Sequence, residues 1–147
     1  HHIEGIAREG NTPFKVDLFT QIDGNLWMGG CPVTEAPEYF KYIFCLYPWE
    51  RYHVHEHQVL TQVQMFDAGK IPDEDMLNAL AAMVNASRSA GPTLVHCQAG
   101  LNRSGLITAL ALIRSGMGPR EAIDRLRNKR SEAVLCNRAF ASWLEAA

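Results

Sequence analysis

The sequence lacks the features that mark repeat, membrane-spanning and secreted proteins. It has no internal repeat, no low-complexity tract and no linker rich in serine or glycine, so we expect one continuous unit. Its longest apolar run, from Leu106 to Ile113, is interrupted by Thr108 and falls well short of the roughly 18–20 residues of a membrane span. No basic segment followed by an apolar one opens the chain, so no secretory signal is visible. These absences predict a protein without membrane association.

Cysteine is also sparse. The four cysteines stand at positions 31, 45, 97 and 136, and no two of them form a Cys-x-x-Cys pair. Disulfide frameworks and zinc sites are typical of denser or more closely spaced cysteines. We therefore predict reduced thiols in a cytoplasmic protein, and each cysteine raises the question of its reactivity.

The composition is that of a globular protein. Charged residues make up 20% and hydrophobic residues 47% of the 147 residues, and a chain of this length buries a sizeable core. We predict one domain over residues 1–147, present as a monomer. The first five residues, His-His-Ile-Glu-Gly, look like the remnant of an expression tag or a disordered arm.

The net charge of −2 conceals an asymmetry. Residues 1–100 contain 6 basic and 12 acidic residues, whereas residues 101–147 contain 8 and 4. The chain lacks the strong positive balance of a protein that acts on nucleic acid. A basic last third would attract an anionic substrate, although we interpret most of these charges as solvated helix faces.

Short apolar and alternating runs predict strands between amphipathic helices. The predicted strands are Val16–Ile22, Leu26–Met28, Tyr42–Leu46, Gln62–Phe66 and Thr93–His96. The predicted helices are Asp73–Ser89, Ser104–Ser115, Pro119–Lys129 and Asn137–Ala146, with short helices at Thr34–Lys41 and His53–Thr61. This alternation predicts an α/β fold whose mostly parallel central sheet of 4–5 strands is flanked by helices. Ligands of such folds bind at the carboxyl ends of strands, here after Thr93–His96.

The junction at that point reads His-Cys-Gln-Ala-Gly-Leu-Asn-Arg-Ser from position 96 to 104. Successive N–H groups of such a short loop point inward and bind an anion, and the helix N-terminus adds positive charge. Gly100 permits a positive φ, and the planar guanidinium of Arg103 clasps two phosphate oxygens. Cys97 lies at the bottom of this cradle, whose positive potential favours a nucleophilic thiolate. The predicted phosphate-binding residues are Gln98, Ala99, Gly100, Leu101, Asn102 and Arg103.

This segment resembles the active-site signature of the cysteine-dependent protein tyrosine phosphatases, most closely of their dual-specificity branch. The resemblance covers most of the chain in order and length. It implies a single dual-specificity phosphatase-like domain that works through a phosphocysteine intermediate with no cofactor and no metal. It also implies that Cys97 is the nucleophile, that His96 supports it, and that Ser104 helps the cysteine to leave as a thiolate.

The same resemblance implies a general acid, an aspartate on a movable loop upstream of the cysteine. Asp67 lies 30 positions before Cys97, where it would protonate the leaving oxygen and then activate water. Asp73 and Asp75 are nearby competitors, but they stand at the start of a predicted helix, where aspartate caps the helix and complements its dipole.

The substrate is less well determined. We expect the substrate to be a phosphorylated protein. We also expect a shallow site with broad activity on aryl phosphates, because the long insertions that build deep tyrosine-selective pockets are missing. The loop has no lysine, which disfavours an inositol phosphate. The Asn102-Arg103 pair is similar to one in RNA 5′-triphosphatases of the superfamily, so RNA 5′-phosphate removal is the alternative activity. A phosphate-binding pseudophosphatase without catalysis is the alternative of a different class.

Two residues are candidates for the rim that contacts substrate. Trp49 follows the predicted strand Tyr42–Leu46 and either stacks on the substrate or packs under the loop. Arg130 ends a basic helix, as an arginine that touches substrate does in some relatives; a structural role is the alternative.

Two further side-chain groups invite a function. His53, His55 and His57 alternate, but no carboxylate or cysteine completes a metal site, so we predict none. Cys45 ends a strand of the sheet that holds Cys97, and some relatives have a second cysteine at a similar place. It is either a core thiol or a redox partner that traps oxidised Cys97 as a disulfide.

Overall fold

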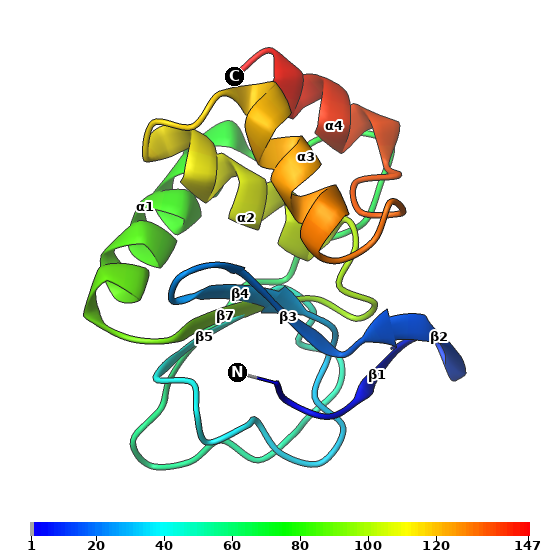
Figure 1. Ribbon diagram of the computed structural model, residues 1–147, viewed down its shortest axis with the longest axis vertical. Coiled ribbons are helices and arrows are strands. Elements are labelled where there is room, and N and C mark those ends of the chain that lie inside the picture. The colour runs from blue at the N-terminus through cyan, green and yellow to red at the C-terminus, as the bar shows by residue number, and fades with distance from the viewer. Residues whose placement is uncertain (1) are drawn as a thin grey trace.

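A computed structural model describes residues 2–147; His1, the first residue of the predicted tag remnant, lies outside the described residues. The strands are β1 (Ile6–Glu9), β2 (Thr12–Asp17), β3 (Phe19–Asp23), β4 (Leu26–Gly29), β5 (Tyr42–Cys45), β6 (Val59–Gln62) and β7 (Thr93–His96). The helices are α1 (Glu74–Ala90), α2 (Arg103–Arg114), α3 (Pro119–Lys129) and α4 (Arg138–Glu145). Six strands come first, and α1, β7 and the three remaining helices follow, so strand and helix alternate only around β7 (Figure 1).

The central sheet has five strands in the order β3-β4-β7-β5-β6. Strands β4, β7, β5 and β6 are parallel, and only the edge strand β3 is antiparallel to its neighbour. Strands β1 and β2 form a separate antiparallel hairpin. The predicted α/β fold with a mostly parallel sheet is confirmed, and β7 lies at the centre of that sheet.

All four helices cover one face of the sheet (Figure 1). Helix α2 lies against β4 and β7, and its residues from Ser104 to Leu112 are buried, which explains why this segment is so strongly apolar. The opposite face is covered by the chain between β4 and β6, which packs Phe40 against Phe19 and Trp27. Two hydrophobic layers therefore hold β7 and the loop that follows it.

The structure corrects four predicted elements, of which the first two are strands. The run Val16–Ile22 is not one strand: at Leu18 the chain changes partners, with its N–H donating to Gly5 and its carbonyl accepting from Gly30. The strand predicted at Gln62–Phe66 lies earlier, as β6, because its partner β5 ends at Cys45, opposite Gln62.

The short helices predicted at Thr34–Lys41 and His53–Thr61 are also wrong. These segments run beside each other and are joined by a β-bridge between Glu35 and His53. The side chain of Gln58 donates to the carbonyls of Pro37 and Phe40. Pro37 lies within the first segment, where proline disfavours a helix.

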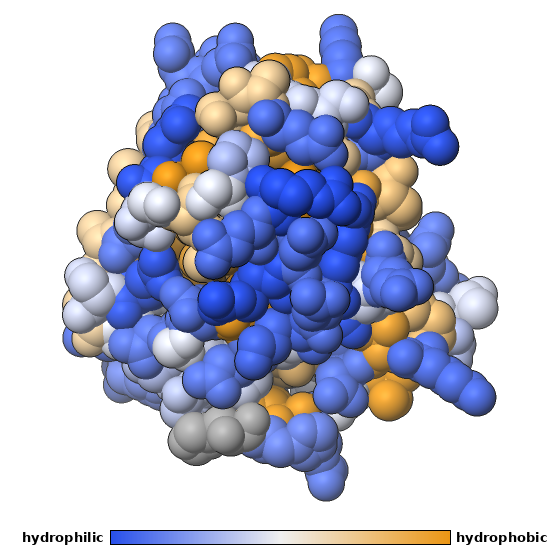
Figure 2. Space-filling view, turned by 45° about the horizontal axis from the view of Figure 1, so that its top comes forward, coloured by the Kyte–Doolittle hydropathy of each residue, from blue (hydrophilic) through white to orange (hydrophobic). Residues whose placement is uncertain are grey.

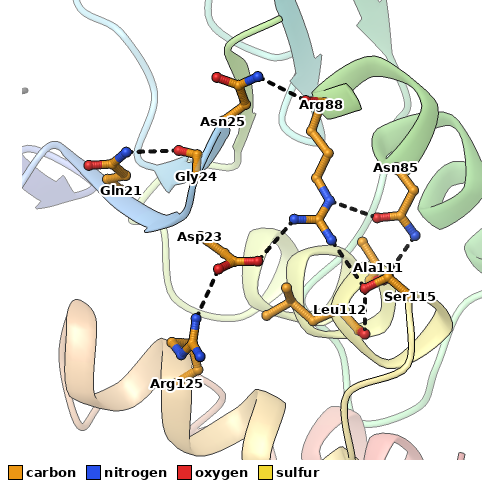
Figure 3. A network of polar contacts seen from close by, with 10 residues as sticks. All are labelled: Gln21, Asp23, Gly24, Asn25, Asn85, Arg88, Ala111, Leu112, Ser115 and Arg125. Atoms are coloured by element: carbon orange, nitrogen blue, oxygen red, sulfur yellow. Dashed lines mark hydrogen bonds and ion pairs between the residues drawn. The ribbon is translucent and has the colours of Figure 1, made fainter. Parts of the chain in front are cut away.

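The carboxylate of Asp23, at the end of β3, joins three elements (Figure 3). One oxygen accepts from Arg88 of α1 at 3.2 Å and the other from Arg125 of α3 at 3.1 Å. Arg88 also donates to Asn85 and Ser115. This network ties the helical layer to the antiparallel edge of the sheet, far from the end of β7.

The basic residues of the last third are mostly held by partners. Arg120 pairs with Asp124 and Glu145, Arg125 with Asp23, and Arg127 donates to the carbonyls of Val134 and Leu135. Arg125 and Arg127 are therefore exceptions to the interpretation of most of these charges as solvated helix faces. Hydrophilic side chains cover most of the face in Figure 2, with hydrophobic ones in separate patches. Among residues 2–147, no helix is both long and apolar enough to cross a bilayer.

Candidate active site

The loop from Cys97 to Asn102 joins the end of β7 to the start of α2. Gly100 has a φ of 77°, and a Cβ at this position would come within 2.6 Å of the backbone of Gly29. Only glycine fits this left-handed and closely packed position. The loop therefore lies directly against the end of β4, which contains Gly29.

Every carbonyl of the loop from Cys97 to Leu101 is bonded at the rear, away from the pocket. The donors are the His96 ring for Cys97, the Cys31 N–H for Gln98, the Arg130 guanidinium for Ala99 and Gly100, and the Leu135 N–H for Leu101. When consecutive carbonyls point one way, the amide groups between them are free to face the other. This arrangement forms the anion cradle that the spacing of the sequence predicts.

Cys97 lies on the wall of a pocket of about 250 Å³. The residues that line it are Glu9, Asp67, Cys97, Gln98, Ala99, Leu101, Asn102, Arg103 and Cys136. The Cys97 Sγ lies 3.3 Å from the hydroxyl of Ser104, within α2. Helix α2 begins at Arg103 without a side-chain cap, so its first amide groups and its dipole remain available to an anion.

Arg103 keeps most of its hydrogen-bonding capacity. Its Nη1 donates to the carbonyl of Met65 at 3.2 Å, and its guanidinium lies 5.0 Å from the centre of the Tyr47 ring. Its buried Nε makes no hydrogen bond within the described part of the chain. Buried polar groups are nearly always paired, so this donor indicates a place for an anionic ligand.

His96 is fully buried behind the cysteine. Its Nδ1 lies 3.0 Å from the carbonyl of Cys97 and its Nε2 2.6 Å from the hydroxyl of Tyr52. Burial lowers the pKa of His96 to about 4, so the ring is neutral at neutral pH. Because a carbonyl only accepts, Nδ1 carries the proton and Nε2 accepts from Tyr52. Sequence reasoning missed this contact of Tyr52, since nothing in the local pattern shows that its side chain reaches His96.

Asp67 lies on the same pocket, exposed, within the loop that joins β6 to α1. Its two oxygens accept from the side-chain amides of Asn102 at 2.9 Å and Asn137 at 2.7 Å. Asp73, in contrast, caps α1 by accepting from the N–H of Asp75, as its position at a helix start predicts. The structure brings Asp67 to Cys97 and Arg103, and gives Asp73 a structural role.

The side chains of two predicted phosphate-binding residues are directed elsewhere. The Asn102 amide holds Asp67 and accepts from the N–H of Asn137. The Gln98 amide lies between Tyr47 and Glu50. Only the backbone of these two residues is available to a phosphate, and Asn102 has a role that requires no RNA.

Arg130 does not line the rim. It lies behind the loop, where its guanidinium donates to Ala99, Gly100, Asp17 and Thr20 at 2.7–3.1 Å. Burial lowers its pKa to about 10, which still leaves it charged at neutral pH. The geometry corrects the predicted substrate contact of Arg130 to a support of the loop.

Trp49, in contrast, is part of an exposed aromatic row beside the pocket. Its ring centre lies 5.1 Å from that of Tyr47 and 5.4 Å from that of Phe66. Trp49 is 44% exposed and Phe66 63%. Phe66 precedes Asp67, so the row runs from the arginine of the pocket to its carboxylate. The sequence indicated Trp49 but not Phe66, which was assigned to a strand.

Cys45 is buried at the end of β5, opposite His96 in the register. Burial raises the pKa of Cys45, which keeps it a thiol at neutral pH. It also borders a second pocket of about 250 Å³. Cys31 is a further buried thiol beside the loop, and burial raises its pKa to about 12.

The three alternating histidines lie close together, with His53 and His55 ring centres 4.9 Å apart. The Nε2 atoms of His55 and His57 contact the carbonyls of Ala36 and Glu38. Among residues 2–147, no group of three or more potential ligands could hold a metal ion.

Comparison with known proteins agrees with this geometry. The profile of the dual specificity phosphatase catalytic domain matches residues 34–147. Human protein tyrosine phosphatase type IVA 3 is 39% identical over 72 residues, 47% of this chain and 42% of that protein. A probable protein tyrosine phosphatase type IVA B of Dictyostelium discoideum is 31% identical over 74 residues, 47% of this chain and 45% of that protein. The match thus spans less than half of these curated relatives.

The fold also has close counterparts among solved structures. The crystal structure of a mouse putative dual specificity phosphatase complexed with zinc tungstate superposes with a TM-score of 0.75 at 19% identity, covering 88% of this chain and 87% of that one.

Proposed function

The chain belongs to the dual-specificity phosphatase family, and on that premise we propose that it hydrolyses phosphomonoesters through a phosphocysteine intermediate. The observation that carries this proposal is the loop itself, whose five carbonyls from Cys97 to Leu101 are bonded at the rear. Amide groups directed at the pocket bind the equatorial oxygens of a phosphoryl group and stabilise its charge in the transition state.

In the first step, the Cys97 Sγ attacks phosphorus and the bond to the leaving oxygen breaks. Asp67 protonates that oxygen, while Arg103 and the loop amides hold the remaining phosphoryl oxygens. Protonation by Asp67 suits its exposed place on the wall of the pocket that Cys97 also lines.

In the second step, the Asp67 carboxylate takes a proton from water, which attacks the phosphocysteine and releases phosphate. The Ser104 hydroxyl, 3.3 Å from Sγ, donates a hydrogen bond to the departing thiolate. The neutral His96 fixes the carbonyl of Cys97 at the rear of the loop and carries no charge into either step.

We propose a phosphorylated protein as substrate, with phosphotyrosine preferred. The row of Tyr47, Trp49 and Phe66, of which Trp49 and Phe66 are exposed, offers rings on which an aryl phosphate stacks. Aromatic pairs contribute about 0.5–1.5 kcal/mol beyond their buried area. All four cysteines are free, which supports a reducing, cytoplasmic compartment.

The test is phosphate release, with EDTA present, from para-nitrophenyl phosphate, phosphotyrosine and phosphoserine peptides, and 5′-triphosphorylated RNA. We expect rapid release from the aryl and phosphotyrosine substrates and none from Cys97→Ser. Cys136→Ser is the matched control, because it removes another thiol from the wall of the same pocket. A large preference for RNA would replace the protein substrate by an RNA end. No Cys97-dependent release would leave a phosphate-binding pseudophosphatase.

Asp67→Asn tests the general acid. We expect kcat to fall about 10²–10⁴-fold with phosphate affinity nearly unchanged. Asp75→Asn, which removes a carboxylate outside the pocket lining, is expected to retain wild-type rates. Wild-type rates of Asp67→Asn on both alkyl and aryl esters would place the acid elsewhere.

We also propose that Cys45 is the redox partner of Cys97. Hydrogen peroxide would oxidise the Cys97 thiolate to sulfenic acid, and the Cys45 thiol would then attack that sulfur, forming a disulfide and releasing water. The high pKa of Cys45 slows the second reaction, so the disulfide is expected to form over minutes at neutral pH. Intact-mass analysis of wild type and Cys45→Ser after mild peroxide tests it: the same reducible species in both would refute the pairing.

A further inference from the structure

The β1–β2 hairpin (residues 6–17) lies outside the segment that matches the family profile, which begins at residue 34. Nevertheless the hairpin docks on the phosphate loop. At its turn, the N–H of Gly10 donates to the side-chain oxygen of Gln98 at 3.3 Å. The chain therefore supplies a wall to the active site from a part that the family profile does not describe.

A second contact fixes the hairpin in that position. Both terminal nitrogens of Arg8 bond to the carboxylate of Glu50, which also accepts from Gln98. The hydrogen bond from Arg8 lowers the pKa of Glu50, so this carboxylate remains charged and paired at neutral pH. A two-oxygen ion pair of this kind orients both partners.

With Arg8 held in this way, the next residue, Glu9, lines the active-site pocket. Glu9 and Asp67 contribute the two carboxylates of the pocket lining. Asp67 accepts from two asparagine amides, whereas the carboxylate of Glu9 makes no hydrogen bond or ion pair within the described residues. Glu9 takes no part in the proposed chemistry, so its charge is available to a substrate.

An unpaired carboxylate beside an anion-binding loop repels any additional negative charge on the substrate and attracts a positive one. The loop binds the phosphate itself, so the negative charge of Glu9 acts on the substrate groups next to the phosphate. An acidic flanking residue or a polyphosphate chain is disfavoured, and a lysine or arginine next to the phosphorylated residue is favoured.

We propose that Glu9 is a specificity-determining residue that selects phosphopeptides with a basic residue next to the phosphotyrosine. This inference rests on the proposed function, since it concerns the substrate of the same site. The hairpin supplies the charge, and its docking to Gln98 and Glu50 positions that charge at the pocket.

The test uses three phosphotyrosine peptides that differ only in the flanking residue, which is arginine, glutamine or glutamate. For the wild type, we expect kcat/KM for the arginine peptide to exceed that for the glutamate peptide about five-fold, since exposed charge pairs are each worth a factor of roughly 2–5. The ratio should shrink between about 10 mM and about 1 M salt, as the Debye length falls from about 30 to about 3 Å.

Glu9→Gln should reduce the ratio of kcat/KM for the arginine peptide to kcat/KM for the glutamate peptide at least about two-fold. Glu9→Lys should invert this ratio, and Glu9→Asp should preserve it. The rate on para-nitrophenyl phosphate, which has no flanking residue, should change less than about two-fold in Glu9→Gln. Glu4→Gln is the matched control, because it removes one carboxylate from the same N-terminal segment but outside the pocket lining. An unchanged ratio in both Glu9→Gln and Glu9→Lys would overturn the proposal.

Binding separates this inference from the proposed function. The affinities of Cys97→Ser for the three labelled peptides, measured by fluorescence anisotropy with and without Glu9→Gln, need no turnover. If the wild type releases no phosphate but the affinity ratio still depends on Glu9, the proposed activity fails and the specificity role stands. If turnover is normal but the affinity ratio does not depend on Glu9, the proposed activity stands and the specificity role fails.

Discussion

The front and the rear of the phosphate loop each contain an arginine, and the two arginines are used in opposite ways. Arg130, at the rear, donates to three backbone carbonyls and one hydroxyl. Arg103, at the front, donates to one carbonyl and leaves its buried Nε without a partner within residues 2–147. The protein thus completes the hydrogen bonds of the arginine that builds the loop and leaves those of the other to a ligand.

The same contrast extends to the other groups of the site. At the rear, His96 is buried, neutral and bonded through both ring nitrogens. At the front, Glu9 and Asp67 are exposed carboxylates on the pocket. The groups at the rear of the loop therefore stabilise the fold, whereas those at the front are available to the substrate. Mutations can test each side separately.

Arg103→Lys should have the largest effect, and it should act on catalysis. Lysine lacks the planar fork that binds two phosphoryl oxygens, so we expect kcat/KM for para-nitrophenyl phosphate to fall about 10²–10³-fold. The melting temperature should stay within a few degrees of wild type, because Arg103 makes one hydrogen bond within the protein. A large loss of stability would remove the contrast between the two arginines.

Arg130→Lys should have the opposite profile. Lysine cannot reach all four acceptors, and each buried acceptor left without a donor costs about 1–3 kcal/mol. We expect the free energy of unfolding to fall by about 3 kcal/mol in denaturant titrations, with a smaller loss of activity than for Arg103→Lys. Equal effects of the two substitutions on activity, with no difference in stability, would contradict this expectation.

Acid should weaken the rear of the loop through His96. Its folded pKa is about 4, against about 6.5 for an unfolded histidine. Below about pH 6.5 the unfolded chain therefore binds a proton that the folded chain does not. The contribution of neutral His96 to the free energy of unfolding is complete above that pH. It falls by about 1.4 kcal/mol per pH unit as the pH decreases toward about 4.

Ring nitrogen chemical shifts of His96 provide the direct measurement. A neutral ring with the proton on Nδ1 is expected at about pH 6, where an unperturbed histidine is mostly charged. A doubly protonated ring at that pH would show that burial does not keep His96 neutral. Because titration of the carboxylates also affects acid unfolding, the ring nitrogen shifts, rather than the unfolding curve, test the protonation state of His96.

Tyr52→Phe should have the smallest effect of the four. It removes the hydroxyl that donates to His96 Nε2 and leaves this buried acceptor unpaired, which costs about 1–2 kcal/mol. Unfolding by urea measures this loss, and kcat/KM should change only a few-fold because Tyr52 lies behind the loop. A loss of activity as large as that of Arg103→Lys would assign Tyr52 to the front.

The front of the site was largely predictable from the sequence, and the rear was not. Cys97, Arg103 and Ser104 lie within one continuous segment, where spacing alone determines their arrangement. Asp67 came from the resemblance to the phosphatase family, which implies a general acid on a loop upstream of the cysteine. Arg130 and Tyr52 act across 30 and 44 positions, and no local pattern encodes such contacts.

The fold shows a similar limit. Helix α3 and strand β7 match their predicted bounds because periodicity and flanking proline or glycine define them locally. The hairpin β1–β2 was missed, and the segments after β4 and β5 were taken for helices. The structure of these segments depends on their pairing with distant chain, as between Glu35 and His53, rather than on local propensity.

The position of β7 has a consequence for how the protein is made. Its two neighbours, β4 and β5, are joined only through β7, yet both precede it in the chain, separated from it by α1. During synthesis the sheet has no centre until residue 96 has emerged, and the parallel pairing that completes it forms slowly because it closes long loops. The cradle of the cysteine that follows β7 is completed later still, because the donors to the carbonyls of Ala99, Gly100 and Leu101 are Arg130 and Leu135. A growing chain therefore completes its sheet before its reactive site, and a chain that stops short of residue 135 lacks the donors that hold the loop.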